Sequence, residues 1–254
     1  MPAGSAFQVQ WEGPDSRDDF IAIAEKGSKE LRYRDYTYTK KGNPADFVAS
    51  GDVGNYEMRY VHAHTRQVIG RADIKVTPVE AAVQAPASAA VAVEFEVVWQ
   101  GPAYPSDYIS VARPDQRPGS YVNYTYTRDG SPLKVRAPSD PGSYEVRYTM
   151  GRGNKLLAKT NIEIKAVSAQ LQAPASADMA TAFDLAWQGP DNKSDYISIA
   201  RPDQRPGSYK GYTYTSRGNP AKVKAPREPG IYEVRYILGR GNKLLDKTTI
   251  EITP

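Results

Sequence analysis

The chain repeats itself at a fixed spacing of 88 residues. Its three tryptophans, Trp11, Trp99 and Trp187, keep this spacing, and so do three copies of the pattern Tyr-Thr-Tyr-Thr. Residues 93–165 and 181–253 are identical at 49 of 73 aligned positions. A unit of this length can bury a core of its own, unlike the ~20–45-residue units of solenoid proteins. The predicted domains are residues 1–78, 79–166 and 167–254.

Within each repeat, apolar and polar residues alternate with a period of two. In the segment Tyr-Glu-Val-Arg-Tyr at 144–148 of the second repeat, three apolar residues alternate with Glu145 and Arg147. Such alternation, interrupted by clusters of Gly, Pro and Asp, is typical of half-buried β-strands, and no stretch of the chain has the apolar stripe of a helix. Short strands in a unit of this length predict an antiparallel β-sandwich. We expect the tryptophans to be buried at equivalent positions of the three cores.

A lead-in segment distinguishes the first repeat from the other two. The sequence QAPASA precedes the second repeat at 84–89 and the third at 172–177, and it is absent before the first. The first strand of the first repeat is therefore predicted to be missing or short, which would leave a partly open sheet edge. We expect this repeat to be the least stable, and the chain to be an excised fragment with an added start methionine.

Two motifs resemble known β-sandwich families. The segment VVWQGP at 97–102 resembles the second strand of fibronectin type III domains, and Asp140 to Tyr148, DPGSYEVRY, resembles the tyrosine corner of immunoglobulin-like domains. The whole repeat is similar to repeats attached to von Willebrand A-type domains in bacterial envelope proteins. The resemblance implies an all-β fold of three tandem immunoglobulin-like antiparallel β-sandwich domains in an extended array. It also implies a location in the bacterial periplasm, at the cell surface or outside the cell.

Composition narrows the class of protein further. Apolar residues make up 40% of the chain and charged residues 24%, which is typical of a globular protein. The net charge of +4 is too small and too dispersed to predict a nucleic-acid partner. There is no cysteine, so a disulfide framework and a thiolate metal site are both excluded. No apolar run reaches the ~18 residues that a membrane-spanning helix needs, and no signal peptide is recognisable at the N-terminus.

No set of catalytic residues is evident in the sequence. The only histidines, His62 and His64, are both in the first repeat, so no Ser-His-Asp arrangement can be built in the other two. The two histidines would share one face of a strand and would suit a metal ion, but no third ligand stands near them. We interpret them as exposed structural residues, with a metal pair as the alternative. The sequence predicts a protein that is not an enzyme and has no cofactor.

Acidic residues follow each tryptophan in a loop. The third repeat has Asp191, Asn192 and Asp195 there, which would suit calcium, whereas the second repeat keeps only Asp107. With Asp107 as its sole carboxylate, the second repeat could not bind calcium in the same way as the third. We therefore favour a structural role in which Asp19, Asp107 and Asp195 accept hydrogen bonds from backbone N–H groups of the turn.

Tyrosine is abundant, with 18 residues. Most tyrosines occupy alternating strand positions, so we interpret them as core residues. The alternative is a platform of exposed rings that stacks on sugars. For Tyr121 and Tyr209, which end the repeated loop, the pattern says least about whether the ring is buried or exposed.

The nine residues RPDQRPGSY occur twice, at 113–121 and at 201–209. In one interpretation this loop lies at the opposite end of its domain from the GRGNK hairpin, and Arg113 or Arg117 pairs with Asp191 or Asp195 of the next domain. In the other it is a solvated hairpin. The candidate interdomain or partner contacts are Arg113, Asp115, Arg117, Tyr121, Arg201, Asp203, Arg205, Tyr209, Arg152, Arg240, Asp107 and Asp195.

These observations favour a non-enzymatic structural spacer or protein-interaction array of immunoglobulin-like repeats. The resemblance implies that it belongs to a larger bacterial envelope or secreted protein. A carbohydrate-binding or adhesive module is the alternative, because the tyrosines permit it. We expect a protein partner, with a glycan as the alternative, and no nucleic acid.

Overall fold

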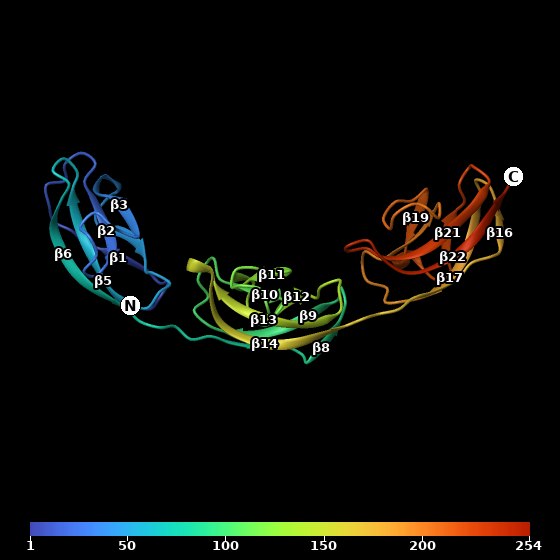
Figure 1. Cartoon of the computed structure of the whole chain (residues 1–254), viewed down its shortest axis with the longest axis horizontal. Helices are drawn as coiled ribbons and strands as arrows, with labels where there is room; N and C mark the ends of the chain where they lie inside the picture. The colour runs from blue at the N-terminus through green and yellow to red at the C-terminus, as the bar shows by residue number, and fades with distance from the viewer. The chain divides into compact units, whose positions relative to one another are not determined.

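The computed structural model describes residues 1–254, which form β-strands joined by turns and four short 3-10 helices (Figure 1). The chain divides into two compact units. The first unit contains residues 1–85, 97–133 and 145–160, and the second contains 86–96, 134–144 and 161–254. The predicted boundaries of three repeats stay a prediction.

The strands occupy equivalent positions in the three repeats. In the first repeat they are β1 (Ala6–Val9), β2 (Phe20–Glu25), β3 (Asp35–Tyr38), β4 (Ala45–Val48), β5 (Gly54–His62) and β6 (Gln67–Val76), with η1 at Thr39–Lys41. In the second repeat they are β7 (Ala82–Gln84), β8 (Ser88–Ala90), β9 (Glu94–Gln100), β10 (Tyr108–Ala112), β11 (Asn123–Tyr126), β12 (Leu133–Arg136), β13 (Gly142–Met150) and β14 (Lys155–Lys165), with η2 at Thr127–Asp129 and η3 at Arg152–Asn154. In the third repeat they are β15 (Gln170–Gln172), β16 (Ser176–Asp178), β17 (Ala182–Gln188), β18 (Tyr196–Ala200), β19 (Gly211–Tyr214), β20 (Ala221–Lys224), β21 (Gly230–Leu238) and β22 (Lys243–Thr253), with η4 at Thr215–Arg217.

The third repeat, which lies entirely in the second unit, forms two sheets. One sheet has the strand order β16-β22-β21-β18-β19, and the other has the order β15-β17-β20. All pairs are antiparallel except β16 with β22, which is parallel. The strand order of the second repeat is the same, with β11-β10-β13-β14-β8 and β12-β9-β7. The chain is therefore an all-β protein of tandem immunoglobulin-like sandwiches, as the sequence predicted.

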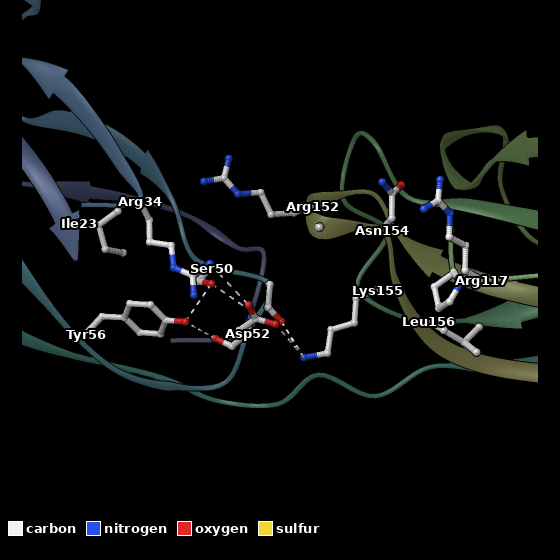
Figure 2. A pocket seen from close by; sticks show the side chains of 13 residues that line it. Ile23, Arg34, Ser50, Asp52, Tyr56, Arg117, Arg152, Asn154, Lys155 and Leu156 are labelled. Carbon is white, nitrogen blue, oxygen red and sulfur yellow. Dashed lines mark hydrogen bonds and ion pairs between the residues drawn. The ribbon is translucent and has the colours of Figure 1, made fainter. Parts of the chain in front are cut away.

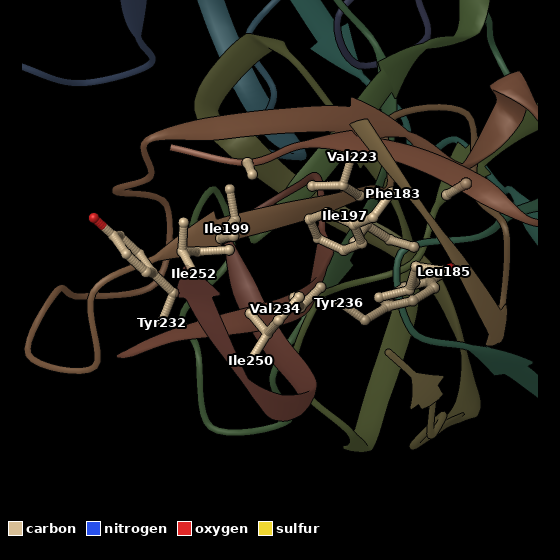
Figure 3. Close-up of a cluster of buried hydrophobic side chains, with 12 residues drawn as sticks. Phe183, Leu185, Ile197, Ile199, Val223, Tyr232, Val234, Tyr236, Ile250 and Ile252 are labelled. Atoms are coloured by element: carbon tan, nitrogen blue, oxygen red, sulfur yellow. The ribbon is translucent and has the colours of Figure 1, made fainter. Parts of the chain in front are cut away.

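The core of the third repeat lies between its two sheets (Figure 3). Leu185 from the smaller sheet and Ile197 and Ile199 from the larger one are fully buried. The tyrosine corner is present, because the hydroxyl of Tyr232 donates a hydrogen bond to the carbonyl oxygen of Glu228 at 3.0 Å. The hydroxyl of Tyr144 makes the equivalent bond to Asp140 at 3.1 Å. This part of the resemblance is confirmed.

The tryptophans occupy equivalent sites, but the prediction that they are buried is wrong, because each is only half-buried. The indole N–H of Trp99 donates a hydrogen bond to the carbonyl oxygen of Gly130 at 2.8 Å, and Trp187 donates to Gly218 at 3.2 Å. A ring with a polar N–H is well placed at the rim of a core, where it can reach such a partner.

The first repeat has a smaller second sheet than the others. Its larger sheet has the order β3-β2-β5-β6, and its smaller sheet consists of β1 and β4 alone. Nothing in this repeat takes the position that β7 and β15 hold beside β9 and β17. No helix in the structure is long and apolar enough to cross a membrane.

Candidate functional site

Each repeat presents a cluster of aromatic rings, which we call its tyrosine face. In the second repeat the rings of Tyr121 and Tyr124 are 4.8 Å apart between centroids, and those of Tyr124 and Tyr126 are 5.3 Å apart and nearly perpendicular. Tyr108 on β10 packs edge-on against Tyr121 and Tyr124. The three faces consist of Phe20, Tyr33, Tyr36 and Tyr38; Tyr108, Tyr121, Tyr124 and Tyr126; and Tyr196, Tyr209, Tyr212 and Tyr214.

The outer rings of these faces are open to solvent, which corrects the interpretation of those tyrosines as core residues, whereas Tyr108 and Tyr196 are buried, as predicted. The exposed fractions are 42% for Tyr36, 43% for Tyr124 and 45% for Tyr212, and Tyr121 and Tyr209 are exposed as well. The tyrosines of the Tyr-Glu-Val-Arg-Tyr segments are buried, as predicted. The sequence therefore contains two populations of tyrosine with different surroundings.

The threonines of the Tyr-Thr-Tyr-Thr pattern explain which side of the strand is exposed. Thr127 is buried, and its hydroxyl donates a hydrogen bond to the carbonyl oxygen of Asp107 at 3.1 Å. Thr215 makes the same bond to Asp195 at 3.3 Å. Thr127 and Thr215 are the first residues of η2 and η4, directly after β11 and β19. Within β19 itself Thr213 is buried, and since successive side chains point to opposite faces of a strand, Tyr212 and Tyr214 on either side of it point outward.

Hydrogen bonds between the exposed tyrosines raise the pKa of their hydroxyls, and an arginine lies close to one of the rings. A hydrogen bond with the hydroxyl of Tyr126 raises the pKa of Tyr124 above its ordinary value of 10.0, and Tyr212 raises the pKa of Tyr214 in the same way. The guanidinium of Arg128 lies 4.7 Å from the ring centroid of Tyr126. At neutral pH the faces thus offer neutral hydroxyls, ring edges and an adjacent cation to a ligand.

A buried arginine organises the loop that carries Tyr121. Arg147 on β13 is 3% exposed and lies beneath the RPDQRPGSY loop. Its guanidinium donates to the carbonyl oxygens of Gln116 at 2.9 Å and Arg113 at 3.0 Å. Arg235 makes the equivalent bonds to Gln204 at 2.8 Å and Arg201 at 3.0 Å.

A buried glutamate and a lysine complete this anchor. Arg147 donates from Nε to Glu145 at 2.7 Å, and Lys159 donates to the other carboxylate oxygen of Glu145 at 2.7 Å. Burial raises the pKa of Glu145, but the hydrogen bonds from Lys159 and Arg147 outweigh it and hold the pKa below its ordinary value of 4.5. The carboxylate is therefore ionised at neutral pH and holds the guanidinium in place.

Sequence reasoning missed this anchor. The signal was a Glu-x-Arg pair inside an otherwise core-forming strand, which occurs in all three repeats as Glu57-Arg59, Glu145-Arg147 and Glu233-Arg235. Charged residues are rarely buried unless they are paired, so a repeated pair of this kind indicates a structural ion pair.

The predicted position of the RPDQRPGSY loop is wrong. The prediction placed it at the opposite end of its domain from the GRGNK hairpin, but Gly119 lies against Asn154 of that hairpin, and Gly207 lies against Asn242. The loop folds back over the sheet because the buried arginine holds its backbone there. The side chains of Arg113, Asp115, Arg117, Asp203 and Arg205 are exposed on this loop, and that of Arg201 is half-buried.

Asp107 and Asp195 hold a turn, as the structural interpretation predicted. Asp195 is 1% exposed and accepts hydrogen bonds from the hydroxyl of Tyr236 at 3.2 Å and the backbone N–H groups of Asn192 at 3.0 Å and Gly239 at 3.1 Å. Asp107 is fully buried and accepts the equivalent bonds. Neither carboxylate is open to an arginine from elsewhere.

A pocket of about 740 Å³ lies in the first unit (Figure 2). Its wall carries the cationic side chains of Arg34, Arg117, Arg152 and Lys155. Arg152 pairs with Asp35 at 2.9 Å, and Lys155 pairs with Asp52 at 3.7 Å. In the second unit, the main-chain oxygen of Arg240 accepts a hydrogen bond from the hydroxyl of Ser139 at 3.2 Å. Because carboxylates pair with Arg34, Arg152 and Lys155, we assign no chemistry to the pocket.

The histidines do not gather with other metal ligands. A hydrogen bond of 2.8 Å joins Nδ1 of His62 and the hydroxyl oxygen of Thr65. No group of three or more His, Asp or Glu side chains in the structure is placed to hold a metal ion.

No protein-family model matches this sequence, and no curated protein is significantly similar to it. Among solved structures, the chain is similar to the FN1–FN3 domains of chicken CNTN1, with 11% identity, a TM-score of 0.29, and coverage of 99% of this chain and 96% of that chain. It is also similar to immunoglobulin domains 1–4 of Sidekick-1, with 11% identity, a TM-score of 0.24, and coverage of 99% and 72%.

The buried tyrosines predict a sharp loss of stability in alkali. Burial, together with the neighbouring Asp195, raises the pKa of Tyr236 far above its ordinary value of 10.0. A raised pKa means that this contribution to stability is fully present below pH 10 and is lost as the pH rises toward the pKa of the folded state. We expect circular dichroism and tyrosinate absorbance to change together, in one cooperative step. Ionisation of every tyrosine near pH 10 with the fold intact would contradict the burial.

Proposed function

We propose that this chain is a non-enzymatic protein-interaction array whose tyrosine faces are the binding surfaces. The observation that supports this proposal is that all three repeats expose a ring cluster at the same place. Tyrosine and arginine are enriched at the energetic centres of protein interfaces, and tyrosine buries a large area at a small entropic cost. A spacer alone would not need exposed apolar rings.

Repetition adds a second advantage to such a surface. When several copies of a weak site bind one partner, each further contact is intramolecular and the overall affinity rises by about 10²–10⁴. This effect suits a partner that is itself repetitive or clustered on a surface. The resemblance of the repeats to bacterial envelope proteins supports a role as part of such a protein, in the periplasm, at the cell surface or outside the cell.

Alanine substitution of the exposed tyrosines tests this proposal. Changing Tyr36, Tyr124 and Tyr212 together is expected to weaken partner binding by at least about 100-fold, whereas changing one of them weakens it much less. The measurement is capture of partner proteins from the source organism on the immobilised chain, followed by quantification of each captured protein. The melting temperature should change little, since these side chains are exposed.

A matched control uses exposed apolar residues outside the faces. Ile69, Val98 and Ile231 are each about half exposed, one in each repeat. Changing these three to alanine removes a comparable apolar area and is expected to leave the captured proteins unchanged. Equal losses in both triple variants would show nonspecific apolar binding and would contradict the proposal.

Carbohydrate binding is the second candidate, because the same rings have edges and hydroxyls suited to sugars. A glycan array distinguishes the two functions. Specific glycan binding that is abolished by Tyr121→Ala and Tyr209→Ala would assign the faces to carbohydrate rather than to protein.

A further inference from the structure

The edge strand of the larger sheet in the third repeat leaves main-chain groups unpaired. β19 is the last strand of this sheet and pairs only with β18. Directly after β19, the N–H of Thr215 donates to the carbonyl oxygen of Asp195 at 3.0 Å. Hydrogen-bonded residues alternate along an antiparallel pair, so Thr213 is the next residue that bonds to β18. The main-chain N–H and C=O groups of Tyr212 and Tyr214 therefore point to the free edge.

One side chain distinguishes this edge from the equivalent edges of the other repeats. In the first repeat the carboxylate of Asp35 accepts a hydrogen bond from the main-chain N–H of Tyr36 at 2.9 Å. The second repeat has Asn123 at this position, and an asparagine side-chain oxygen can accept the same bond. The third repeat has Gly211 there, so the main-chain N–H of Tyr212 has no acceptor. The edge is therefore most open in the third repeat.

Two cationic side chains without an ion-pair partner lie beside this edge. Arg217 follows β19 in η4, and the main-chain oxygen of Lys224 on β20 lies 3.4 Å from the place of an added Cβ on Gly211. Both side chains are exposed, and neither forms an ion pair. The nearby Lys222 lies opposite Asp184 on β17, which offsets its charge. An acidic partner complements such an edge, whereas a second copy of the same edge would be repelled.

We propose that the free edge of β19 accepts an extended, acidic peptide segment of another protein, in which carboxylate residues alternate with apolar ones. The main chain of this segment bonds to the free groups of Tyr212 and Tyr214. Its apolar side chains lie against the rings of these tyrosines, which are 45% and 37% exposed, and its carboxylates reach Lys224 and Arg217. Main-chain hydrogen bonds supply affinity and the side chains supply specificity, as in other cases of β-strand addition. This inference rests on the proposed function, since both tyrosines belong to a tyrosine face.

Three substitutions of Gly211 test the main-chain contact. An added Cβ would meet no atom closer than the main-chain oxygen of Lys224 at 3.4 Å and a side-chain carbon of Ile199 at 3.6 Å, so the repeat should stay folded. Gly211→Ala adds this Cβ alone and is the matched control. Gly211→Asn adds an acceptor for the N–H of Tyr212 without a charge. Gly211→Asp adds both the acceptor and a negative charge, as Asp35 does in the first repeat.

The experiment titrates a fluorescent peptide of alternating glutamate and valine with the whole chain and follows its anisotropy. We expect saturable binding of one peptide per chain, both to the unaltered chain and to Gly211→Ala. The affinity should fall by at least about threefold for Gly211→Asn and at least about tenfold for Gly211→Asp, with the melting temperature unchanged. A peptide of the same sequence that is N-methylated at every residue keeps the charge but cannot donate main-chain hydrogen bonds, and it should not bind.

Three results would overturn the proposal. The first is no binding to the unaltered chain, and the second is equal binding by Gly211→Ala and Gly211→Asp. The third is equal binding of the N-methylated peptide, since charge alone would then act and an acidic glycan would be the better occupant.

The failure of this inference is distinguishable from the failure of the proposed function. If the peptide does not bind while the triple variant of Tyr36, Tyr124 and Tyr212 still loses its captured proteins, the acceptor edge is wrong and the tyrosine faces stand. If peptide binding depends on Gly211 while the triple variant captures its proteins unchanged, the edge is supported and only the proposed function is contradicted.

Discussion

Replacing Arg235 with methionine is expected to destabilise the third repeat by about 3–5 kcal/mol. The change removes the donors that hold the loop at Gln204 and Arg201, and it leaves Glu233 buried with Lys247 as its remaining partner. The buried carboxylate loses its more buried partner and the loop carbonyl oxygens lose their donors, and both losses reduce stability. Urea denaturation followed by circular dichroism measures the change in the free energy of unfolding.

The double variant Arg235→Met with Glu233→Leu separates charge from packing. Because it removes both charges, we expect it to recover about half of the lost stability. The loop itself should stay mobile in the double variant, since its carbonyl oxygens still lack donors, and limited proteolysis should cut between Arg201 and Arg205. A single variant with unchanged stability and a protease-resistant loop would contradict the anchor.

The second large effect is expected for Asp195→Ala, which should cost about 3–5 kcal/mol. The change leaves the hydroxyl of Tyr236 and the backbone N–H groups of Asn192 and Gly239 without their shared acceptor in a buried site. Hydrogen bonds to an ionised group are worth about 1.5–3 kcal/mol each, so losing three together is severe.

Two comparisons make the Asp195 prediction specific. Tyr236→Phe removes one donor to Asp195 and the acceptor of the Asp191 N–H, and it should cost less, about 1–2 kcal/mol. Thermal unfolding in buffers with and without calcium distinguishes the turn role from ion binding. If calcium raised the melting temperature of the unaltered chain and not that of Asp195→Ala, the carboxylate would be a ligand, and the structural role would be wrong.

The sequence predicted the architecture because repetition and period-two alternation are local properties. The Glu-Val-Arg segment and the Tyr-Thr-Tyr-Thr segment were both recognised as strands, and both are strands. In a strand of alternating residues Tyr124 and Tyr126 share a face, and in the structure their rings are in contact. The alternation could not show which face is inside, since a threonine that bonds to the backbone of Asp107 is as suitable for the interior as a ring.

The loop position was beyond local reasoning for a different reason. The RPDQRPGSY segment folds back because Arg147, more than 25 residues later in the chain, binds its carbonyl oxygens. A charged residue in a strand is ordinarily expected to face solvent, so its buried contact with a distant loop is not predicted from the sequence. The half-burial of Trp99 has a similar origin, because its indole N–H depends on a carbonyl oxygen of Gly130.

The anchor beneath the loop recognises backbone and not side chains. In the first repeat Arg59 donates to the carbonyl oxygens of Ser28, Lys29 and Glu30, at 2.9, 2.8 and 2.7 Å, although that loop reads KGSKEL and shares little with RPDQRPGS. One guanidinium therefore supports unrelated loop sequences in the same protein. This separation of support from display is what an engineered binding scaffold requires: residues 201–208 of the third repeat are a natural position for a randomised library, with Arg235 left in place.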